Sequence, residues 1–347
     1  MHYINRHQKR RDIMKKICAF MPLLALCGIM VGCAGKPQYQ EHVTLKALAT
    51  GYDMGYSFDG EAFALSGYGS RRFLHYSIPE GIVGRVGDRA IFFDRVKVWL
   101  AYPVVDINGT AAIRDVDWMM TLAPLFLYPV DGFPVAGRKV VLDPGHGGDH
   151  PGAIGAISEE KDINLSVAKQ VGERLEAAGV KVIYTRTGDE TVELPPRAAA
   201  GGQSGADMFL SIHCNAAPNP SASGIETFSI APQGAANSND IDNSLRVDVD
   251  SNATGYDMVK DSMALSYSIQ KRLMASFDVV DRGAKRARFH VLYHNTVPAA
   301  LVECGFMSNE AEEQKLNDPD YQARLADAIA AGVIDYLGRR PISAATK

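Results

Sequence analysis

Five short apolar runs recur between residues 139 and 337, and most of them alternate with segments of helical periodicity. The runs are Val140–Leu142, Val180–Thr185, Met208–Ile212, Gly224–Ile230 and Val297–Val302. Apolar runs bounded by turn residues are typical of strands that are covered on both faces of a sheet. Four segments have helical periodicity. The first follows Glu160, the second begins at Pro195-Pro196, and the other two are Met263–Phe277 and Tyr321–Leu337. This alternation predicts an α/β domain over residues 138–338, with a mainly parallel central sheet flanked by helices.

Three of the runs lead into side chains that can bind a metal or transfer a proton. The first passes through Asp143-Pro144 into a glycine-rich loop that holds His146, the third ends on His213, and the fifth ends on Glu303. The carboxyl ends of parallel strands meet at one edge of a sheet, which is where open α/β sheets bind ligands. A glutamate at the end of a buried strand is costly unless it is paired or functional. We therefore expect these side chains to lie close together.

A fourth candidate, Glu160, begins the helix that follows the first strand. Two imidazoles and one carboxylate would form a zinc set that leaves one tetrahedral position for water, and a second glutamate could act as general base. The spacing does not decide which of Glu160 and Glu303 has which role. Locally, Glu159 and Glu160 also fit an ordinary helix start, with Ser158 as N-cap and acidic residues in the first turn.

Together these segments resemble the zinc-dependent N-acetylmuramoyl-L-alanine amidases of the amidase-3 type, from about Arg138 to Leu337. The motifs, in family order, are Val141-Leu142-Asp143-Pro144-Gly145-His146-Gly147-Gly148, Glu160-Lys161-Asp162-Ile163-Asn164-Leu165, Thr185-Arg186, Ser211-Ile212-His213-Cys214-Asn215-Ala216 and Leu301-Val302-Glu303-Cys304-Gly305-Phe306-Met307-Ser308-Asn309. The resemblance implies that His146, Glu160 and His213 bind one Zn²⁺ and that Glu303 is the catalytic base.

The implied substrate is peptidoglycan, cleaved at the amide between the lactyl group of N-acetylmuramic acid and L-alanine of the stem peptide. Two alternatives stay open. One is a zinc peptidase that acts within the stem peptide, and the other is a non-catalytic wall-binding lipoprotein that keeps the fold. The presence of all four polar residues favours an enzyme.

Three further residues near the strand ends have structural interpretations. Arg186 follows the second strand, and we expect it to pair with neighbouring polar groups rather than with substrate. Cys214 and Cys304 directly follow His213 and Glu303. Because successive side chains in a strand point to opposite faces, both cysteines are expected to face the core as free thiols.

Residues 233–261 are rich in Asn, Asp and Ser, which predicts a surface insertion. Its Asp248, Asp250 and Asn252 begin a calcium-loop spacing, but the glycine and the distal glutamate of such a loop are missing. The insertion has little helical pattern. Some family members carry an inhibitory helix near the site and need an activator, and this pattern gives no reason to expect that control here.

The amino terminus has the pattern of an export signal over residues 1–32. A basic segment, Arg6 to Lys16, precedes the uncharged run Ala19–Gly32, which is too short to span a bilayer comfortably. The end of the run resembles a bacterial lipobox, which predicts cleavage before Cys33, lipidation of that cysteine and a tether over residues 33–42. Ala34 after it resembles the sorting pattern for the outer membrane, so a periplasmic lipoprotein is expected. An ordinary signal peptide, and initiation at Met14 instead of Met1, remain alternatives.

Residues 43–127 carry short alternating segments and a hairpin-type turn at Asn108-Gly109, which predicts a small β-rich, stalk-like domain with a helical piece near residues 116–127. A Pro- and Gly-containing linker, 128–137, and a tail, 339–347, complete the organisation. Glu61, Asp94 and Asp115 are expected to be solvated surface charges. The formal net charge of −4 gives no sign of a nucleic-acid partner, and two cysteines beyond residue 33 exclude a disulfide scaffold.

Overall fold

The computed structural model describes residues 41–67, 81–126, 133–239 and 253–339, and every structural statement below refers to them. The export signal, Cys33, residues 33–40 of the tether, residues 128–132 of the linker, the Asp248–Asn252 spacing and residues 340–347 of the tail lie outside these ranges. Within the described ranges, no helix combines the length and apolar character needed to cross a membrane.

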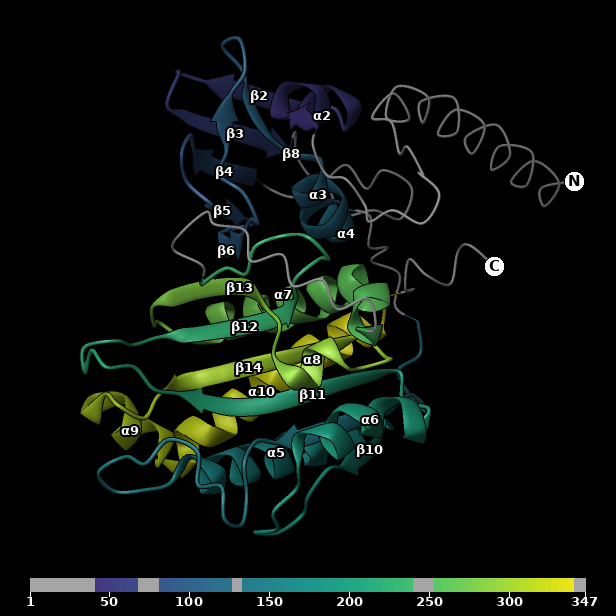
Figure 1. The fold of residues 1–347 in the computed structure, drawn as a ribbon, viewed down its shortest axis with the longest axis vertical. Helices are drawn as coiled ribbons and strands as arrows, with labels where there is room; N and C mark the ends of the chain where they lie inside the picture. Colours follow the sequence, from purple (N-terminus) through teal and green to yellow (C-terminus); the bar gives the residue numbers. More distant parts are fainter. Residues whose placement is uncertain (1–40, 68–80, 127–132, 240–252, 340–347) are drawn as a thin grey trace, which may run out of the picture.

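The carboxyl-terminal half is built on a six-stranded part of a larger sheet (Figure 1). Its strands, in spatial order, are β10 (Lys181–Tyr184), β9 (Lys139–Pro144), β11 (Met208–Asn215), β14 (Ala299–Phe306), β12 (Ile225–Ile230) and β13 (Asp281–Ala287). Neighbouring strands run parallel except for the β12–β14 pair. The predicted mainly parallel α/β sheet is therefore confirmed, and all five predicted strands are present.

Helices cover both faces of this sheet. The long helices α5 (Glu160–Ala177), α7 (Val259–Ser276) and α10 (Pro319–Leu337) pack on one face, and α6 (Leu194–Ser204) and α8 (His290–Tyr293) lie on the other (Figure 1). A short helix, α9 (Glu310–Leu316), follows β14. Helix α6 begins with prolines in its first turn, as predicted. Alternate residues of the strands fill the two cores, so Val140 and Leu142 face α5 while Val141 faces the opposite side.

The amino-terminal half is a β-rich layer, as predicted. Its meander comprises β2 (Met54–Phe58), β3 (Ala62–Gly67), β4 (Gly81–Arg85), β5 (Ala90–Phe93) and β6 (Val96–Trp99). A second small sheet contains β1 (His42–Thr44), β8 (Ala111–Arg114) and β7 (Val105–Asp106), with the Asn108-Gly109 turn between β7 and β8. Helices α2 (Leu45–Gly51), α3 (Asp115–Asp117) and α4 (Ala123–Phe126), with the π-helix η1 (Trp118–Leu122), complete this layer.

The two halves are joined edge to edge, because β6 pairs in parallel with β13 through Val98 and Ala284. The result is one continuous 11-stranded sheet. Strand β13 was not predicted from the sequence, because its segment DRGAKRA is polar. Lys285 and Arg286 are nevertheless buried, because Lys285 forms an ion pair with Glu226 and Arg286 is hydrogen-bonded. Arg286 donates a hydrogen bond to Thr121 Oγ1 at 2.6 Å, which holds the carboxyl-terminal half against the amino-terminal layer.

The polar segment at 233–261 is less exposed than expected. Among its described residues, Ala235 and Ser238 are buried, and α7 begins within it at Val259. The prediction of a surface insertion is wrong for these residues, because hydrogen bonds with β13 and with the residue after it keep this backbone packed against the sheet. Ser238 N donates to Arg286 O at 2.9 Å, and Arg288 donates to the carbonyl of Ala235.

The three acidic residues that were predicted to be surface charges differ from one another. Glu61 is exposed and pairs with Arg85. Asp94 is mostly covered and pairs with Lys271 of α7 at 3.1 Å. Asp115 is buried, which corrects the prediction, and burial raises the pKa of its carboxyl above the usual value. Asp115 accepts a hydrogen bond from Val116 N at 2.7 Å at the start of α3, which explains its position.

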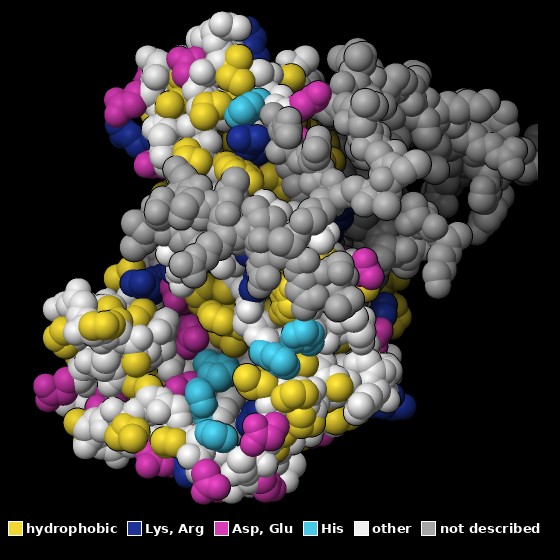
Figure 2. All heavy atoms as spheres, in the orientation of Figure 1, with side chains coloured by type: hydrophobic (Ala, Val, Ile, Leu, Met, Phe, Trp, Pro, Cys, Tyr) yellow, Lys and Arg dark blue, Asp and Glu magenta, His cyan; other side chains and the backbone are white. Residues whose placement is uncertain are grey.

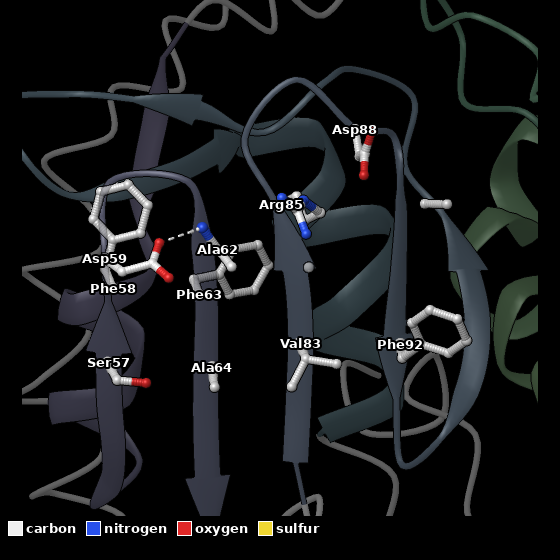
Figure 3. A pocket seen from close by; sticks show the side chains of 12 residues that line it. Ser57, Phe58, Asp59, Ala62, Phe63, Ala64, Val83, Arg85, Asp88 and Phe92 are labelled. Carbon is white, nitrogen blue, oxygen red and sulfur yellow. Dashed lines mark hydrogen bonds between the residues drawn. The ribbon is translucent and has the colours of Figure 1, made fainter.

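The outer face of the meander carries a shallow hollow of about 540 Å³ (Figure 3). Phe58, Phe63, Val83 and Phe92 contribute apolar surface to it. The Asp59 carboxylate at its edge accepts hydrogen bonds from the backbone of Glu61 and Ala62 and so closes the β2–β3 turn. None of the described residues that line the hollow belongs to a cluster of metal-ligating groups, and the hollow lies in a different layer from the predicted site residues.

Candidate metal centre

His146 lies on the loop that leaves β9 at its carboxyl end. Its backbone φ is 61°, a left-handed conformation that is uncommon for a residue with a side chain. The next two residues, Gly147 and Gly148, also have positive φ values of 125° and 56°. Three successive left-handed residues reverse the chain sharply, and two of them need glycine. The turn places the imidazole over the sheet edge, where a third of the side chain is exposed to solvent.

Glu160 is the first residue of α5, and its carboxylate is buried beneath the two histidines. Its Oε1 atom accepts hydrogen bonds from Asn164 Nδ2 at 3.0 Å and from the backbone N–H of Cys214 at 3.1 Å. Its Oε2 atom accepts one from the backbone N–H of Ala153 at 2.8 Å. These contacts fix both oxygens, so the carboxylate presents one defined edge to the site.

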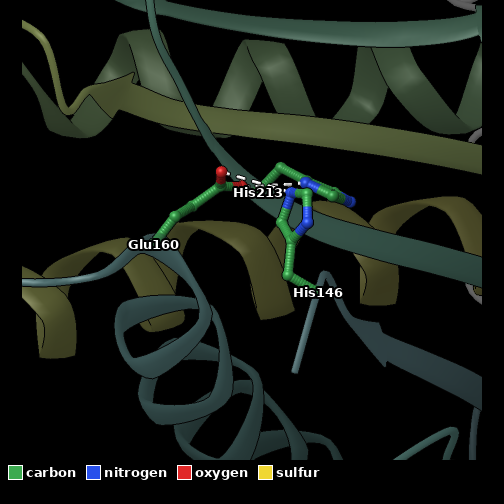
Figure 4. A group of neighbouring side chains, drawn as sticks. All are labelled: His146, Glu160 and His213. Carbon is green, nitrogen blue, oxygen red and sulfur yellow. Dashed lines mark hydrogen bonds and ion pairs between the residues drawn. The ribbon is translucent and has the colours of Figure 1, made fainter. Parts of the chain in front are cut away.

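The structure brings His146, Glu160 and His213 together, as the sequence predicts (Figure 4). His146 Nε2 is 3.2 Å from Glu160 Oε2, and His213 Nδ1 is 2.9 Å from Glu160 Oε1. One ligand atom from each residue lies within 4.8 Å of the other two. Burial favours the neutral carboxyl, but the hydrogen bonds to both imidazoles outweigh it and hold the pKa of Glu160 well below its usual value.

Two glycines make room for this cluster. A Cβ atom at Gly145 would overlap the imidazole of His213, and one at Gly152 would overlap the Glu160 carboxylate. Gly152 also has a positive φ of 74°, so a side chain there would be strained as well as crowded. These positions explain why the loop between β9 and α5 is glycine-rich.

A buried ion pair anchors the His146 loop. Asp143, at the end of β9, pairs with Arg197 of α6 at 2.7 Å and accepts hydrogen bonds from the hydroxyls of Thr185 and Ser211. Arg197 also donates to the carbonyl oxygens of Pro144 and His146. The sequence did not indicate Arg197; an arginine in the first turn of an α/β helix has no distinctive signal of its own.

Arg186 has the structural role that was predicted. Its guanidinium is buried and donates to the carbonyl oxygens of Pro144, Gly145 and Lys161 at 3.0, 2.9 and 2.7 Å. It therefore ties β9 and the His146 loop to the start of α5. These hydrogen-bond acceptors are all backbone carbonyl oxygens, which is consistent with a structural role.

Glu303 lies beside His213, on the same face of the sheet. The two residues are register partners on β11 and β14, and partners in a pleated sheet point to the same side. Glu303 Oε2 is buried without a hydrogen-bond partner. Burial, together with the negative charges of Glu160 and Glu226, raises the pKa of Glu303 well above its usual range.

Sequence comparison agrees with this geometry. The Amidase_3 family profile, described as N-acetylmuramoyl-L-alanine amidase, matches residues 140–335. This range contains the three residues of the cluster, His146, Glu160 and His213, and also Glu303. The chain belongs to this family. Within the amidase, the amino-terminal β-layer lies outside the matched region.

Similarity to individual amidases covers the same half of the chain. Over 203 residues this amidase is 34% identical to N-acetylmuramoyl-L-alanine amidase LytC of Bacillus subtilis (strain 168), covering 58% of this chain and 36% of LytC. It is 34% identical over 220 residues to AmiA of Escherichia coli (strain K12), covering 58% of this chain and 76% of AmiA. The solved structure of AmiC2 of Nostoc punctiforme is 32% identical, with a TM-score of 0.48, and the match covers 58% of this chain and 98% of that one.

The start of α5 differs from the prediction in one respect. Glu159, not Ser158, occupies the N-cap position, and its side chain makes no capping hydrogen bond. Ser158 is instead engaged by α9, because Glu313 accepts hydrogen bonds from the backbone of Ser158 at 3.1 Å and of Ile157 at 2.8 Å. Glu313 thus fixes the loop that precedes Glu160. Nothing in the sequence indicated this role, because Glu313 lies in the charged segment EAEEQKL.

Cys214 and Cys304 are free, buried thiols on the sheet face opposite His213 and Glu303, as predicted. A hydrogen bond with Cys304, and then burial, raise the pKa of Cys214 well above its usual value. Since the Cys214 side chain lies in the core on the opposite face of the sheet, it points away from the His146, Glu160 and His213 cluster.

Glu226, a buried carboxylate on β12, was not predicted from the sequence. It is the register partner of Glu303 across the β12–β14 pair, so it faces the same side as Glu303 and His213. The signal that singled out Glu303, an acidic residue within an apolar strand, was present here too, in the segment Ile225–Ile230.

Proposed function

We propose that this chain hydrolyses the amide between N-acetylmuramic acid and L-alanine in peptidoglycan, using one Zn²⁺ held by His146, Glu160 and His213 and Glu303 as general base. The observation that carries the proposal is the convergence of these four side chains at one sheet edge, within a domain that belongs to the amidase family.

The three-residue cluster fits a zinc ion by its donor set. Two imidazole nitrogens and a carboxylate are ligands that catalytic zinc uses, and they leave a position open for water. In this structure the Glu160 oxygens contact both imidazoles directly. A bound cation would accept the lone pairs of the carboxylate and of the imidazole nitrogens in place of these contacts. The further hydrogen bonds to Glu160, from Asn164 and two backbone N–H groups, orient it as outer partners do around a metal. When bound, Zn²⁺ would polarise the scissile carbonyl and acidify a water molecule.

Glu303 supplies the proton transfer. Its Oε2 atom has no protein partner, so it is free to accept a proton from the attacking water and to pass it to the departing amine. A pKa raised by burial suits both steps, because an ordinary carboxylate would bind the proton too weakly at neutral pH. The register pairing of Glu303 with His213 places this base next to one of the proposed zinc ligands.

A digestion experiment tests the reaction and its metal requirement together. We expect purified sacculi to release free stem peptides that begin with L-alanine, as detected by mass spectrometry. A zinc chelator should abolish the release, and added Zn²⁺ should restore it. Truncated stems that remain attached to the sugar would instead identify a peptidase, and undigested sacculi would identify a wall-binding protein.

For the cellular location we propose a lipoprotein anchored to the outer membrane through Cys33. In a Gram-negative host, we expect Cys33→Ser to move the protein from the membrane fraction to the soluble periplasmic fraction. Cys27→Ser, a change within the apolar part of the signal, is the matched control and should leave the protein in the membrane fraction. Mass spectrometry of mature protein that shows an unmodified Cys33, or cleavage at another site, would contradict the anchor.

A further inference from the structure

A row of ionisable side chains crosses the catalytic face of the sheet beyond the proposed metal centre. His213, Glu303 and Glu226 occupy register positions on the adjacent strands β11, β14 and β12. Opposed residues in a sheet have Cβ atoms about 4.5–5.5 Å apart, so the carboxyl groups of Glu303 and Glu226 are near neighbours. Because both side chains point to the same face of the sheet, a Glu226 carboxyl that lost its present partners could turn toward Glu303.

The Glu226 carboxylate is nevertheless fully engaged by other groups. Its Oε2 atom pairs with Lys285 Nζ at 2.6 Å and with Arg282 Nε at 2.9 Å, and both cations come from β13. Its Oε1 atom accepts a hydrogen bond from Asn215 Nδ2 at 2.8 Å. Glu303 Oε2, in contrast, has no partner. The cations thus satisfy Glu226 and leave Glu303 uncommitted.

The amino-terminal layer holds these cations in place. Trp99 of β6 donates a hydrogen bond from Nε1 to the carbonyl oxygen of Arg282 at 2.9 Å, and its ring lies 5.5 Å from Lys285 Nζ. On the other side of the ammonium, the ring of Phe228 lies 5.6 Å away. Only 6% of the Lys285 side chain is exposed, so its position is set by packing as well as by charge.

We propose that Lys285, held between Trp99 and Phe228, is a positioning residue that keeps Glu226 from binding Glu303 and so keeps Glu303 available for proton transfer. The inference rests on the proposed role of Glu303. It gives the amino-terminal β-layer a part in catalysis, since β6 builds one wall around Lys285.

Lys285→Met tests the inference. Without the ammonium, Glu226 loses its closest partner and can turn toward the unpartnered Oε2 atom of Glu303. We expect kcat on soluble muropeptides to fall about tenfold or more and KM to change less than about twofold, because substrate contacts are untouched. Lys285→Arg, which keeps the charge, should retain most of the activity. Lys271→Met is the matched control, because Lys271 also bridges the two layers, pairing with Asp94 at 3.1 Å and lying 5.9 Å from the Tyr267 ring.

The double variant Glu226→Leu/Lys285→Met gives the decisive readout. It removes the competing carboxylate together with its cation, and Arg282, about a third exposed, can turn to solvent. We expect kcat to recover to within about threefold of the parent, whereas two merely structural losses would add. The double variant buries no unpaired charge, so it remains informative if Lys285→Met fails to fold. Normal kcat in Lys285→Met, or no recovery in the double variant, would overturn the inference. A fully active Glu303→Gln enzyme would instead overturn the proposed function.

Discussion

Replacement of Glu303 by Gln is expected to lower kcat by about 10²–10⁴-fold, the contribution typical of a positioned general acid–base group. The amide is nearly the same size as the carboxyl, so packing between β11 and β12 is kept, but it cannot accept and return a proton. The Oε2 atom is buried without a hydrogen-bond partner, and the neighbouring Glu226 carboxylate is already engaged by Lys285 and Arg282. Binding of substrate is not expected to weaken, so the loss should fall on kcat.

The measurement is the rate of stem-peptide release at matched zinc content, with bound zinc determined for each variant. Equal zinc in the parent and in Glu303→Gln would show that the loss arises in the chemical step rather than in the metal centre. Glu159→Gln is the matched control: this acidic residue precedes Glu160, but its side chain is 42% exposed and pairs with Lys161. It should change activity less than about twofold, as surface changes generally do. Full turnover by Glu303→Gln would refute the base assignment.

The part of the site that the sequence predicts is the part carried by strand ends. His146, His213 and Glu303 each follow or end an apolar run, and parallel pairing of β9, β11 and β14 brings the three together. Glu160 joins them because the same loop that reverses at His146 leads into α5. Each of these steps depends on local pattern and on one topological rule.

What the sequence did not predict depends on contacts between distant segments. The sequence of β13 is polar, so no apolar pattern predicts a buried strand there. Lys285 and Arg286 can be buried because they have partners on β12 and η1. Its pairing with β6 joins Ala284 to Val98, and no local pattern encodes such a register. The β-propensity of a residue reflects how well it fits a half-buried pleated surface. It therefore does not predict a strand whose charged side chains are buried and neutralised by partners.

Arg197 of α6, which supports the proposed metal centre, likewise depends on contacts with distant segments of the chain. Its side chain is 4% exposed, and that of its partner Asp143 is fully buried. Removal of one member of a buried ion pair leaves the other charge without compensation and typically costs 3–5 kcal/mol. We therefore expect Arg197→Met to lower the free energy of unfolding of the metal-free protein by about 3–5 kcal/mol.

Denaturant unfolding in the presence of chelator measures this change without a contribution from zinc binding. Arg138→Met is the matched control, because Arg138 pairs with Asp207 at the same 2.7 Å, but both side chains are 32% exposed. That pair should contribute only about 0–1 kcal/mol. Arg197 also donates to the carbonyl oxygen of His146, so the Arg197→Met protein should bind zinc more weakly even where it is folded. A loss no larger than that of Arg138→Met would show that Thr185 and Ser211, which donate to Asp143, suffice to hold the loop.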